Sequence, residues 1–200
     1  MTTAFTINWD YRCPFARNAH EHLVAALRAG APYEVRFAAF SLDQVHVAEG
    51  EPSVWEQPDK RPTLTHGAAG IVVRDRLPEQ FLEAHLALFA ARHDLGGDLR
   101  QPEVVYEALK RAEVDADAVF AEIEAGWPYD VLRAEHEELV LDHHAFGVPT
   151  FILAGQAVFV RLMTRPAGDA DTARATIDRV LQLVAGHPEL NEFKHTSIPR

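Results

Sequence analysis

The sequence predicts an α/β protein in which a mixed sheet of four strands is interrupted along the chain by a block of helices. Runs of β-forming residues occur in two pairs, one near each end, and helical spacing of apolar residues fills most of the region between them. The 200 residues are 48% hydrophobic, which is enough for a sizeable core, and no internal repeat or low-complexity tract divides them. These observations favour a single structural unit with a helical insertion.

The first forty residues predict a strand, a helix and a second strand. β-formers at residues 5–9 precede a polar break at 10–12, and apolar residues then recur at helical spacing over 15–29. Residues 33–40 alternate between apolar and polar, as a strand with one buried face does. Two strands joined by a helix are expected to pair in parallel.

The stretch 41–76 shows neither period. It is punctuated by prolines and glycines, and Trp55 is its one large anchor. Long connections inside a compact domain are usually functional, as lids or binding loops, or else partly disordered. We therefore expect this stretch to be irregular and to form a lid over Cys13.

Residues 76–146 predict an all-helical insertion. Four segments within it have helical spacing: 78–93, 102–112, 115–125 and 128–146. The rest of the chain, residues 1–75 and 147–200, then forms the sheet-containing core.

The last part of the core predicts two strands and a helix. The strands cover 147–153 and 157–161, and a short hairpin turn that contains Gly155 joins them. An amphipathic helix follows over 169–185. The whole order is therefore β-α-β, helical insertion, β-β-α.

Composition excludes several classes of function. The net charge of −11, with scattered Lys and Arg, argues against a nucleic-acid surface that follows phosphates. The first residues show no export signal, and no run of eighteen apolar residues suggests a membrane span. A single cysteine cannot form an internal disulfide. We therefore expect a cytoplasmic protein that binds neither nucleic acid nor membrane.

Cys13 is the first candidate for chemistry. It stands at the N-cap position of the first predicted helix, with Pro14 at the first helical position, where proline is favoured. The free N–H groups and the dipole of a helix N-terminus favour a thiolate, so we expect the pKa of Cys13 to be lowered. The alternative is that Cys13 is only a small buried apolar residue, which is common for free cysteines.

Two motifs give the chain a resemblance to a known family. Asp10–Ala16 (DYRCPFA) resembles the active-site turn, and Phe146–Phe151 (FGVPTF) the cis-proline segment, of the DsbA-like branch of the thioredoxin superfamily. That branch includes kappa-class glutathione transferases and 2-hydroxychromene-2-carboxylate isomerases. The resemblance implies a thioredoxin-like fold with a helical insertion and a cis bond before Pro149. It also implies that Cys13 is catalytic, and that the thiol or disulfide substrate meets Pro14, Phe15, Val148, Pro149 and Thr150.

One residue departs from the pattern of the disulfide oxidoreductases. Ala16 stands where they have a second cysteine, so the protein cannot hold an internal disulfide at this site. We expect a monothiol Cys-Pro-Phe-Ala oxidoreductase that uses glutathione or another small thiol as its resolving partner, with no tightly bound cofactor. A transferase or isomerase that activates such a thiol is the alternative, and a binding protein that grips extended segments without turnover is a third.

Other residues favour structural roles. His136, His143 and His144 do not have metal-ligand spacing, so we expect no metal site and a solvated or capping role for these histidines. For His20 we expect a surface position, and the alternative is an approach to Cys13 from two turns along the helix. The glutamates at 135, 137 and 138 suggest a solvated helix face, and the tryptophans suggest core or lid anchors. No clear interface is visible, and a homodimer stays open.

Overall fold

A computed structural model gives the structure of residues 2–192, 194–195 and 197. The strands are β1 (Thr3–Trp9), β2 (Tyr33–Ala39), β3 (Thr150–Leu153) and β4 (Gln156–Phe159). The α-helices are α1 (Pro14–Arg28), α2 (Leu42–Val45), α3 (Thr65–Arg76), α4 (Phe81–His93), α5 (Pro102–Arg111), α6 (Ala116–Glu124), α7 (Trp127–His143) and α8 (Ala170–Gly186). Short 3-10 helices are η1 (Val54–Glu56), η2 (Pro58–Leu64) and η3 (Pro78–Gln80).

The four strands form one mixed sheet in the order β2-β1-β3-β4. β1 pairs with β2 in parallel, and β3 runs antiparallel to both β1 and β4. This arrangement confirms the predicted four-stranded mixed sheet and the parallel first pair. It also places the start of α1 and the loop before β3 at the same end of the sheet, because β1 runs toward that end and β3 starts from it.

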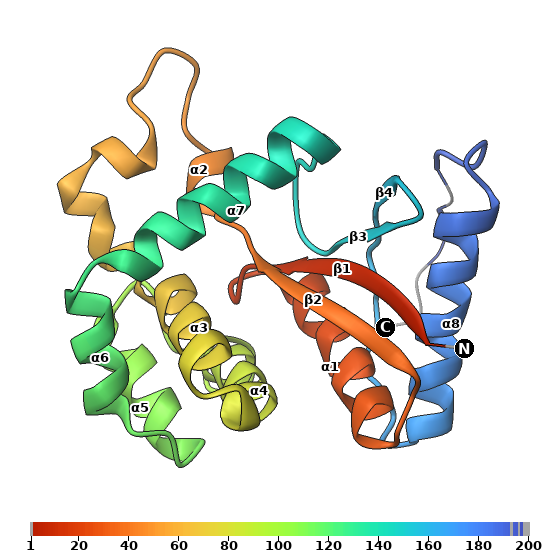
Figure 1. The fold of residues 1–200 in the computed structure, drawn as a ribbon, viewed down its shortest axis with the longest axis horizontal. Helices are drawn as coiled ribbons and strands as arrows, with labels where there is room; N and C mark the ends of the chain where they lie inside the picture. The colour runs from red at the N-terminus through yellow and green to blue at the C-terminus, as the bar shows by residue number, and fades with distance from the viewer. Residues whose placement is uncertain (1, 193, 196, 198–200) are drawn as a thin grey trace.

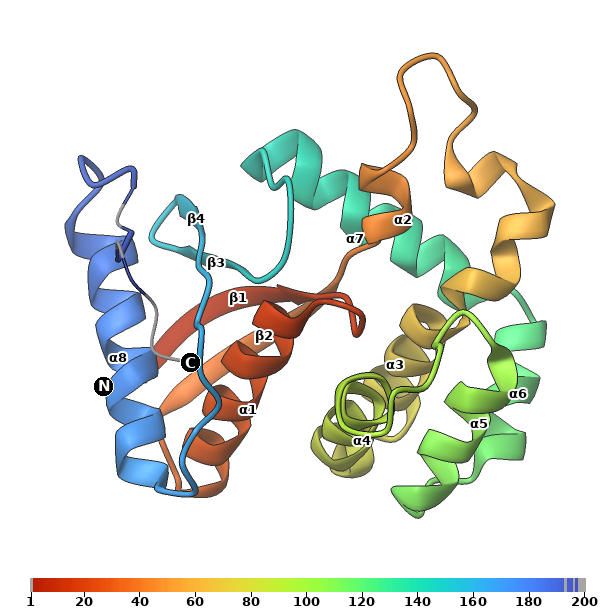
Figure 2. The ribbon, with the colours of Figure 1, turned by 180° about the vertical axis from the view of Figure 1, so that it is seen from behind.

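Helices α1 and α8 cover one face of the sheet and pack on each other, as Figures 1 and 2 show from opposite sides. The core between them is apolar: Ile7 of β1, Leu23 of α1, Phe151 of β3 and Ile177 of α8 are all fully buried. At about 25 cal/mol per Å² of apolar surface, burial of such side chains contributes most of the stabilisation of this layer. The start of α1 is thereby held rigidly against β1 and β3.

Helices α3 to α6 form a separate layer of helices beside the sheet, and α7 runs back over it toward β3 (Figure 1). A second apolar cluster joins these helices to the sheet through Trp9, Phe40, Ile71, Phe89 and their neighbours. The two clusters meet across β1 and α1. The helical insertion therefore packs directly on the elements that lead to Cys13.

The expectation of an irregular stretch over 41–76 was wrong. It contains α2, η1, η2 and the twelve-residue helix α3, whose residues from Thr65 to Val73 are all buried. A helix buried on every side has no apolar stripe, and Gly67 and Gly70 lower its helix propensity, so its sequence lacks the usual signals. Glycine is needed at Gly70 because a Cβ there would lie 2.5 Å from the hydroxyl oxygen of Tyr11. The lid over Cys13 stays a prediction.

Within the described residues, none of the helices combines the length and the apolar character that a bilayer crossing requires.

Candidate active site around Cys13

Cys13 caps the N-terminus of α1, as its place in the sequence predicts. Its backbone is extended, with φ −87° and ψ 120°, and Pro14 occupies the first turn. The Cys13 N–H donates to the carbonyl oxygen of Asp10 at 3.1 Å, and the Cys13 carbonyl accepts from Arg17 at 3.0 Å. The side chain itself caps no N–H group. The turn is thus closed by backbone hydrogen bonds, which leaves the sulfur free to face another part of the chain.

That other part is the loop before β3. The Cys13 sulfur lies 3.2 Å from the carbonyl oxygen of Val148 and donates its hydrogen to it, although 135 residues separate the two. The peptide bond between Val148 and Pro149 is cis. Both Cys13 and Val148 are buried, at 8% and 2% exposure. Two motifs that are far apart in the sequence therefore meet at one sulfur.

The expectation of a lowered pKa for Cys13 was wrong. Burial raises the pKa of the Cys13 thiol, and the nearby carboxylate of Asp10 raises it further. The N–H groups of Phe15 and Ala16 favour the thiolate, but they do not outweigh the burial. The helix terminus does act in the predicted direction. The effect of burial on the pKa, which a sequence does not reveal, is larger than the effect of the helix terminus.

The loop before β3 that contains the cis bond, residues 147–150, is called the cis-proline loop below. Asn8 holds this loop in place from both sides. Its side-chain NH₂ donates to the carbonyl of Gly147 at 3.1 Å, and its side-chain oxygen accepts from the N–H of Thr150 at 2.6 Å. Gly147 and Thr150 flank the Val148–Pro149 bond, and Asn8 is fully buried. The spacing of residues in the sequence did not predict this role. The available signal was a lone amide inside the apolar run of β1, because a buried amide requires hydrogen-bond partners.

A chain of buried hydrogen bonds joins the helical insertion to the active-site turn. The Tyr11 hydroxyl lies 2.8 Å from Nδ1 of His85, His85 Nε2 lies 2.9 Å from Nδ1 of His20, and His20 Nε2 lies 3.1 Å from the carbonyl oxygen of Asn8. A carbonyl only accepts, so His20 donates to it through Nε2. In neutral rings the direction then follows along the whole chain: His85 donates to His20, and Tyr11 donates to His85.

These rings stay neutral because burial lowers the pKa of His20 to about 4 and that of His85 well below its usual value, where neighbouring His20 also contributes. The expectation of a surface position for His20 was therefore wrong. Helix α1 is covered on two sides, by the sheet with α8 and by α4, so even a polar position on it is buried.

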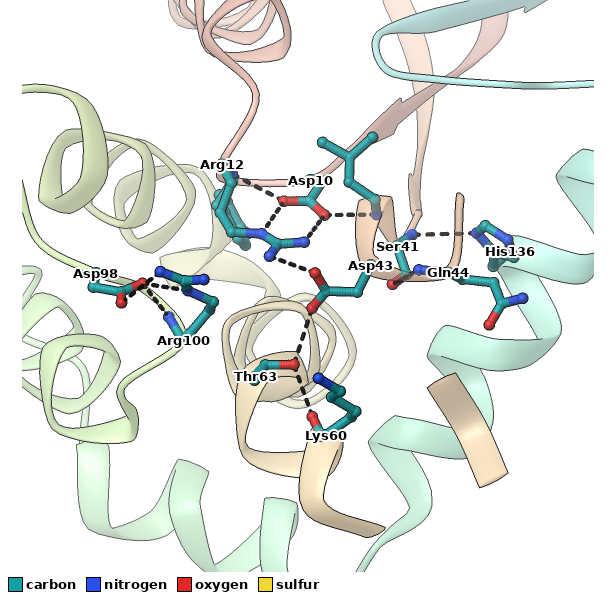
Figure 3. Close-up of polar contacts among 12 residues, drawn as sticks. Asp10, Arg12, Ser41, Asp43, Gln44, Lys60, Thr63, Asp98, Arg100 and His136 are labelled. Carbon is teal, nitrogen blue, oxygen red and sulfur yellow. Dashed lines mark hydrogen bonds and ion pairs between the residues drawn. The ribbon is translucent and has the colours of Figure 1, made fainter. Parts of the chain in front are cut away.

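On the other side of the turn, Asp10 organises a network of charges (Figure 3). Its carboxylate accepts from the backbone and side chain of Arg12 and from the N–H of Leu42 at 2.9 Å. Arg12 continues to Asp43 at 2.7 Å. Burial alone would raise the pKa of Asp10, but His66, Arg12 and the hydrogen bonds from Arg12 and Leu42 hold it below its usual value. The network ties the stretch after β2 to the residues directly before Cys13.

The remaining predicted site residues lie around the same point. Pro14 is exposed and Phe15 is half-buried. Pro149 is buried, and its carbonyl accepts from the N–H of Val160 at 3.0 Å. Thr150 faces inward: its hydroxyl donates to the carbonyl of Gly147 at 2.9 Å, so it is occupied within the loop. Phe146, just ahead of this loop, is 67% exposed, and its ring contacts that of Phe159.

Two expectations about α7 were also wrong. His136 is buried, packs on Phe40 and Trp55, and accepts from the N–H of Ser41 at 3.2 Å. Glu135 accepts from the N–H of Ala39 at 2.6 Å instead of facing only solvent. Helix α7 lies against the end of β2, and its inward face therefore satisfies backbone groups of that strand. By contrast, His144 is at the C-cap of α7, with φ 53°, as a capping role requires.

Comparison with known proteins gives the fold a name. No protein-family model matches the chain. The uncharacterized protein Rv2286c of Mycobacterium tuberculosis is 26% identical over 199 residues, which cover 100% of this chain and 84% of that protein. This relative is similar along the whole chain and carries no assigned activity in its name.

Solved structures show the same architecture. The cytosolic disulfide reductase DsbM from Pseudomonas aeruginosa, solved with GSH, is 16% identical over 90% of this chain and 100% of that chain, with a TM-score of 0.58. Reduced DsbA1 from Neisseria meningitidis is 19% identical over 92% and 85%, with a TM-score of 0.59. ScsC from Proteus mirabilis is 13% identical over 92% and 84%, with a TM-score of 0.60.

These structural neighbours are DsbA-like proteins of the thioredoxin superfamily. The chain has their fold, a mixed four-stranded sheet with a helical insertion. The fold that the two motifs implied is thereby confirmed.

Proposed function

We propose that the protein is a thiol-disulfide oxidoreductase with a single catalytic sulfur, Cys13. In the first step the Cys13 thiolate attacks one sulfur of a disulfide. A mixed disulfide forms, the substrate S–S bond breaks, and the other half leaves as a thiolate. In the second step a small thiol attacks the mixed disulfide, regenerates Cys13 and carries away the substrate half as a new disulfide. Glutathione or a comparable small thiol would supply the sulfur that Ala16 does not.

The observation that carries this proposal is the contact between the Cys13 sulfur and the carbonyl of Val148. It brings the only sulfur nucleophile of the chain against a stretch of backbone that ends in a cis X-Pro bond. A backbone carbonyl next to a nucleophilic sulfur can accept a hydrogen bond from an extended substrate, once the Cys13 S–H has left it. Fold comparison supports the same chemistry, since the neighbours include a disulfide reductase.

The raised pKa sets the pH dependence of the first step. The thiolate is the nucleophile, and it is a minor species of Cys13 near neutral pH because burial favours the thiol. When the pH rises through the folded pKa, the reactive fraction and the rate increase together. A single-sulfur enzyme of this kind depends on a supply of reduced small thiol, so we place it in a reducing compartment such as the cytoplasm.

One observation also favours the transferase or isomerase alternative. Cys13 is a hydrogen-bond donor at rest, since its S–H points at the carbonyl of Val148. A protonated side chain at this position can donate to the thiolate of a bound small thiol without being consumed. In that case serine, which also donates through a hydroxyl, can replace cysteine.

Cys13→Ser therefore separates the two functions. Turnover of a model disulfide in the presence of glutathione, other small thiols and a recycling reductase is expected in the wild-type protein and is expected to vanish in Cys13→Ser. Conjugation of an electrophile to glutathione that survives in Cys13→Ser would instead assign the transferase function. Loss of neither reaction would overturn the proposed role of Cys13.

Ala16→Cys provides a second test. Residues three apart at the start of a helix are close enough to form a disulfide, and Ala16 is fully buried one turn after Cys13. This variant is expected to show no free thiol after oxidation and to exchange with a dithiol partner without a small thiol. If Ala16→Cys still requires the small thiol, the missing second sulfur is not what makes the wild-type protein depend on it.

A further inference from the structure

The segment that leaves β4 is held directly beside the cis-proline loop and α1 (Figure 2). The N–H of Val160 donates to the carbonyl of Pro149 at 3.0 Å. Two residues later, the carbonyl of Leu162 accepts from the side chain of Asn18 on α1 at 2.8 Å. Arg161 lies between these two anchors. Its backbone is therefore fixed at the border of the site, with one neighbour on the cis-proline loop and the other on α1.

The side chain of Arg161 is directed toward the active-site turn. Its guanidinium carbon lies 5.4 Å from the ring centroid of Phe15, which is two residues after Cys13. A guanidinium over an aromatic face is attracted by the ring, and this attraction favours the rotamers that keep the two groups together. Arg161 thus places a positive charge beside Phe15, in the first turn of the helix that Cys13 caps.

Among the described residues, Arg161 forms no ion pair, unlike the arginines at 12, 17 and 165. Arg12 is paired with Asp10 and Asp43. Arg17 and Arg165 both pair with Glu21 and Asp94. Arg161 is exposed and forms no such bridge. The pKa of Glu192 is lowered mainly by Lys194, with which its carboxylate is paired, and only then by the charge of Arg161.

We propose that Arg161 binds the carboxylate of the small thiol or disulfide that exchanges with Cys13, so that the preferred partner is anionic. This rests on the proposed function and deepens it. A guanidinium offers two parallel N–H donors that match a carboxylate, and the attraction to the Phe15 ring favours placements of the group beside α1. The rest of the protein repels such a partner, because its net charge is −11. A local cation at the border of the site is the feature that would overcome this repulsion.

Three matched disulfides test the charge preference in the first step alone, without the second step that regenerates Cys13. They are 3,3′-dithiodipropionate, bis(2-hydroxyethyl) disulfide and cystamine, which carry carboxylates, hydroxyls and ammonium groups on similar chains. The measured quantity is the second-order rate constant for loss of the Cys13 thiol in a single turnover, at fixed pH and low ionic strength. The variants are Arg161→Gln and Arg161→Glu. Arg179→Gln on α8 is the control, since Arg179 is also exposed and has no ion pair among the described residues.

Arg161→Gln is expected to slow the dicarboxylate about threefold to fivefold, at the upper end of the range for an exposed ion pair, and to leave the rate with the hydroxyl reagent unchanged. Arg161→Glu is expected to extend the loss and to speed up cystamine. Added salt is expected to reduce the difference between the wild-type protein and Arg161→Gln in their rates with the dicarboxylate, since the contact is exposed. Arg179→Gln should leave all three rates unchanged.

Equal changes with the three reagents, or no change with the dicarboxylate, would overturn the proposal. Its failure is distinguishable from that of the proposed function. If Arg161 controls the single-turnover rates but Cys13→Ser keeps full turnover, the carboxylate site stands and the oxidoreductase does not. If turnover requires Cys13 but the Arg161 variants change none of the three rates, the oxidoreductase stands and the carboxylate site does not.

Discussion

Replacing Asn8 by alanine tests whether the cis-proline loop is held from β1. In the native protein the Asn8 side chain donates to Gly147 and accepts from Thr150, on either side of the cis bond. Alanine leaves the N–H of Thr150 without a partner in a buried place, whereas the carbonyl of Gly147 keeps the hydroxyl of Thr150. An orphaned buried donor costs about 1–3 kcal/mol, and the lost amide volume adds to it. We expect Asn8→Ala to lower the free energy of unfolding by about 2–4 kcal/mol.

The same change is expected to move two reactions of Cys13 in opposite directions. A loosened loop exposes the sulfur and weakens the burial that raises its pKa, so alkylation by iodoacetamide should become faster. Turnover of a neutral disulfide should become slower, because the carbonyl of Val148 no longer has a fixed position beside the sulfur. Urea unfolding gives the stability, and stopped-flow assays give the two rates.

Asn18→Ala is the matched control. It removes the same side chain from α1, where Asn18 makes a single hydrogen bond to Leu162 outside the cis-proline loop. We expect it to cost about 1 kcal/mol and to leave the alkylation rate of Cys13 unchanged. Should Asn8→Ala cost no more than Asn18→Ala, or change both Cys13 reactions in the same direction, the holding role of Asn8 would be wrong.

Three further predictions follow from the buried groups. Gly70→Ala should lower the free energy of unfolding by about 1–3 kcal/mol, because the new Cβ meets Tyr11 at 2.5–3.1 Å. Gly67→Ala should be tolerated, because its Cβ meets only a flexible leucine side chain, and thermal unfolding measures both variants. His20 has a pKa of about 4 in the folded protein and 6.5 in the unfolded chain, so the unfolded chain binds a proton first as the pH falls. The free energy of unfolding should therefore fall by about 3 kcal/mol between pH 6.5 and pH 4. Urea unfolding at several pH values should show a weaker pH dependence for His20→Gln. Alkylation of Cys13 should rise with pH up to and beyond 9, and a plateau near neutral pH would contradict the raised pKa of its thiol.

The sheet and most helices were predictable because their signals are local. β1 and β2 carry β-formers, α5 begins with Pro102, and α8 has an apolar stripe that faces the sheet. Helix α3 carries no comparable signal, since its residues from Thr65 to Val73 are buried on every side and include two glycines. Hydrophobic periodicity arises because one side of a segment is buried and the other is exposed to water, so a segment that is buried on all sides shows no such period.

The candidate site divides in the same way. Cys13 and Val148 were found because each belongs to a motif of adjacent residues. Asn8, His20 and His85 act through partners from distant parts of the chain, and the spacing of residues in the sequence does not show such pairings. The pKa of Cys13 belongs to this second class. It depends on how much water the fold removes, and not only on the helix that the sulfur caps.

A raised pKa at Cys13 agrees with the absence of a second cysteine. A thiolate is the form that oxidants convert to sulfenic acid, and in a site with two cysteines the neighbour rescues that product as a disulfide. Here Ala16 provides no such rescue. The fold instead keeps the sulfur protonated at rest, by removing water around it and placing the charge of Asp10 nearby. Under the function proposed above, this would lower the reactivity of the one sulfur between turnovers, and an outside thiol would restore it after each exchange.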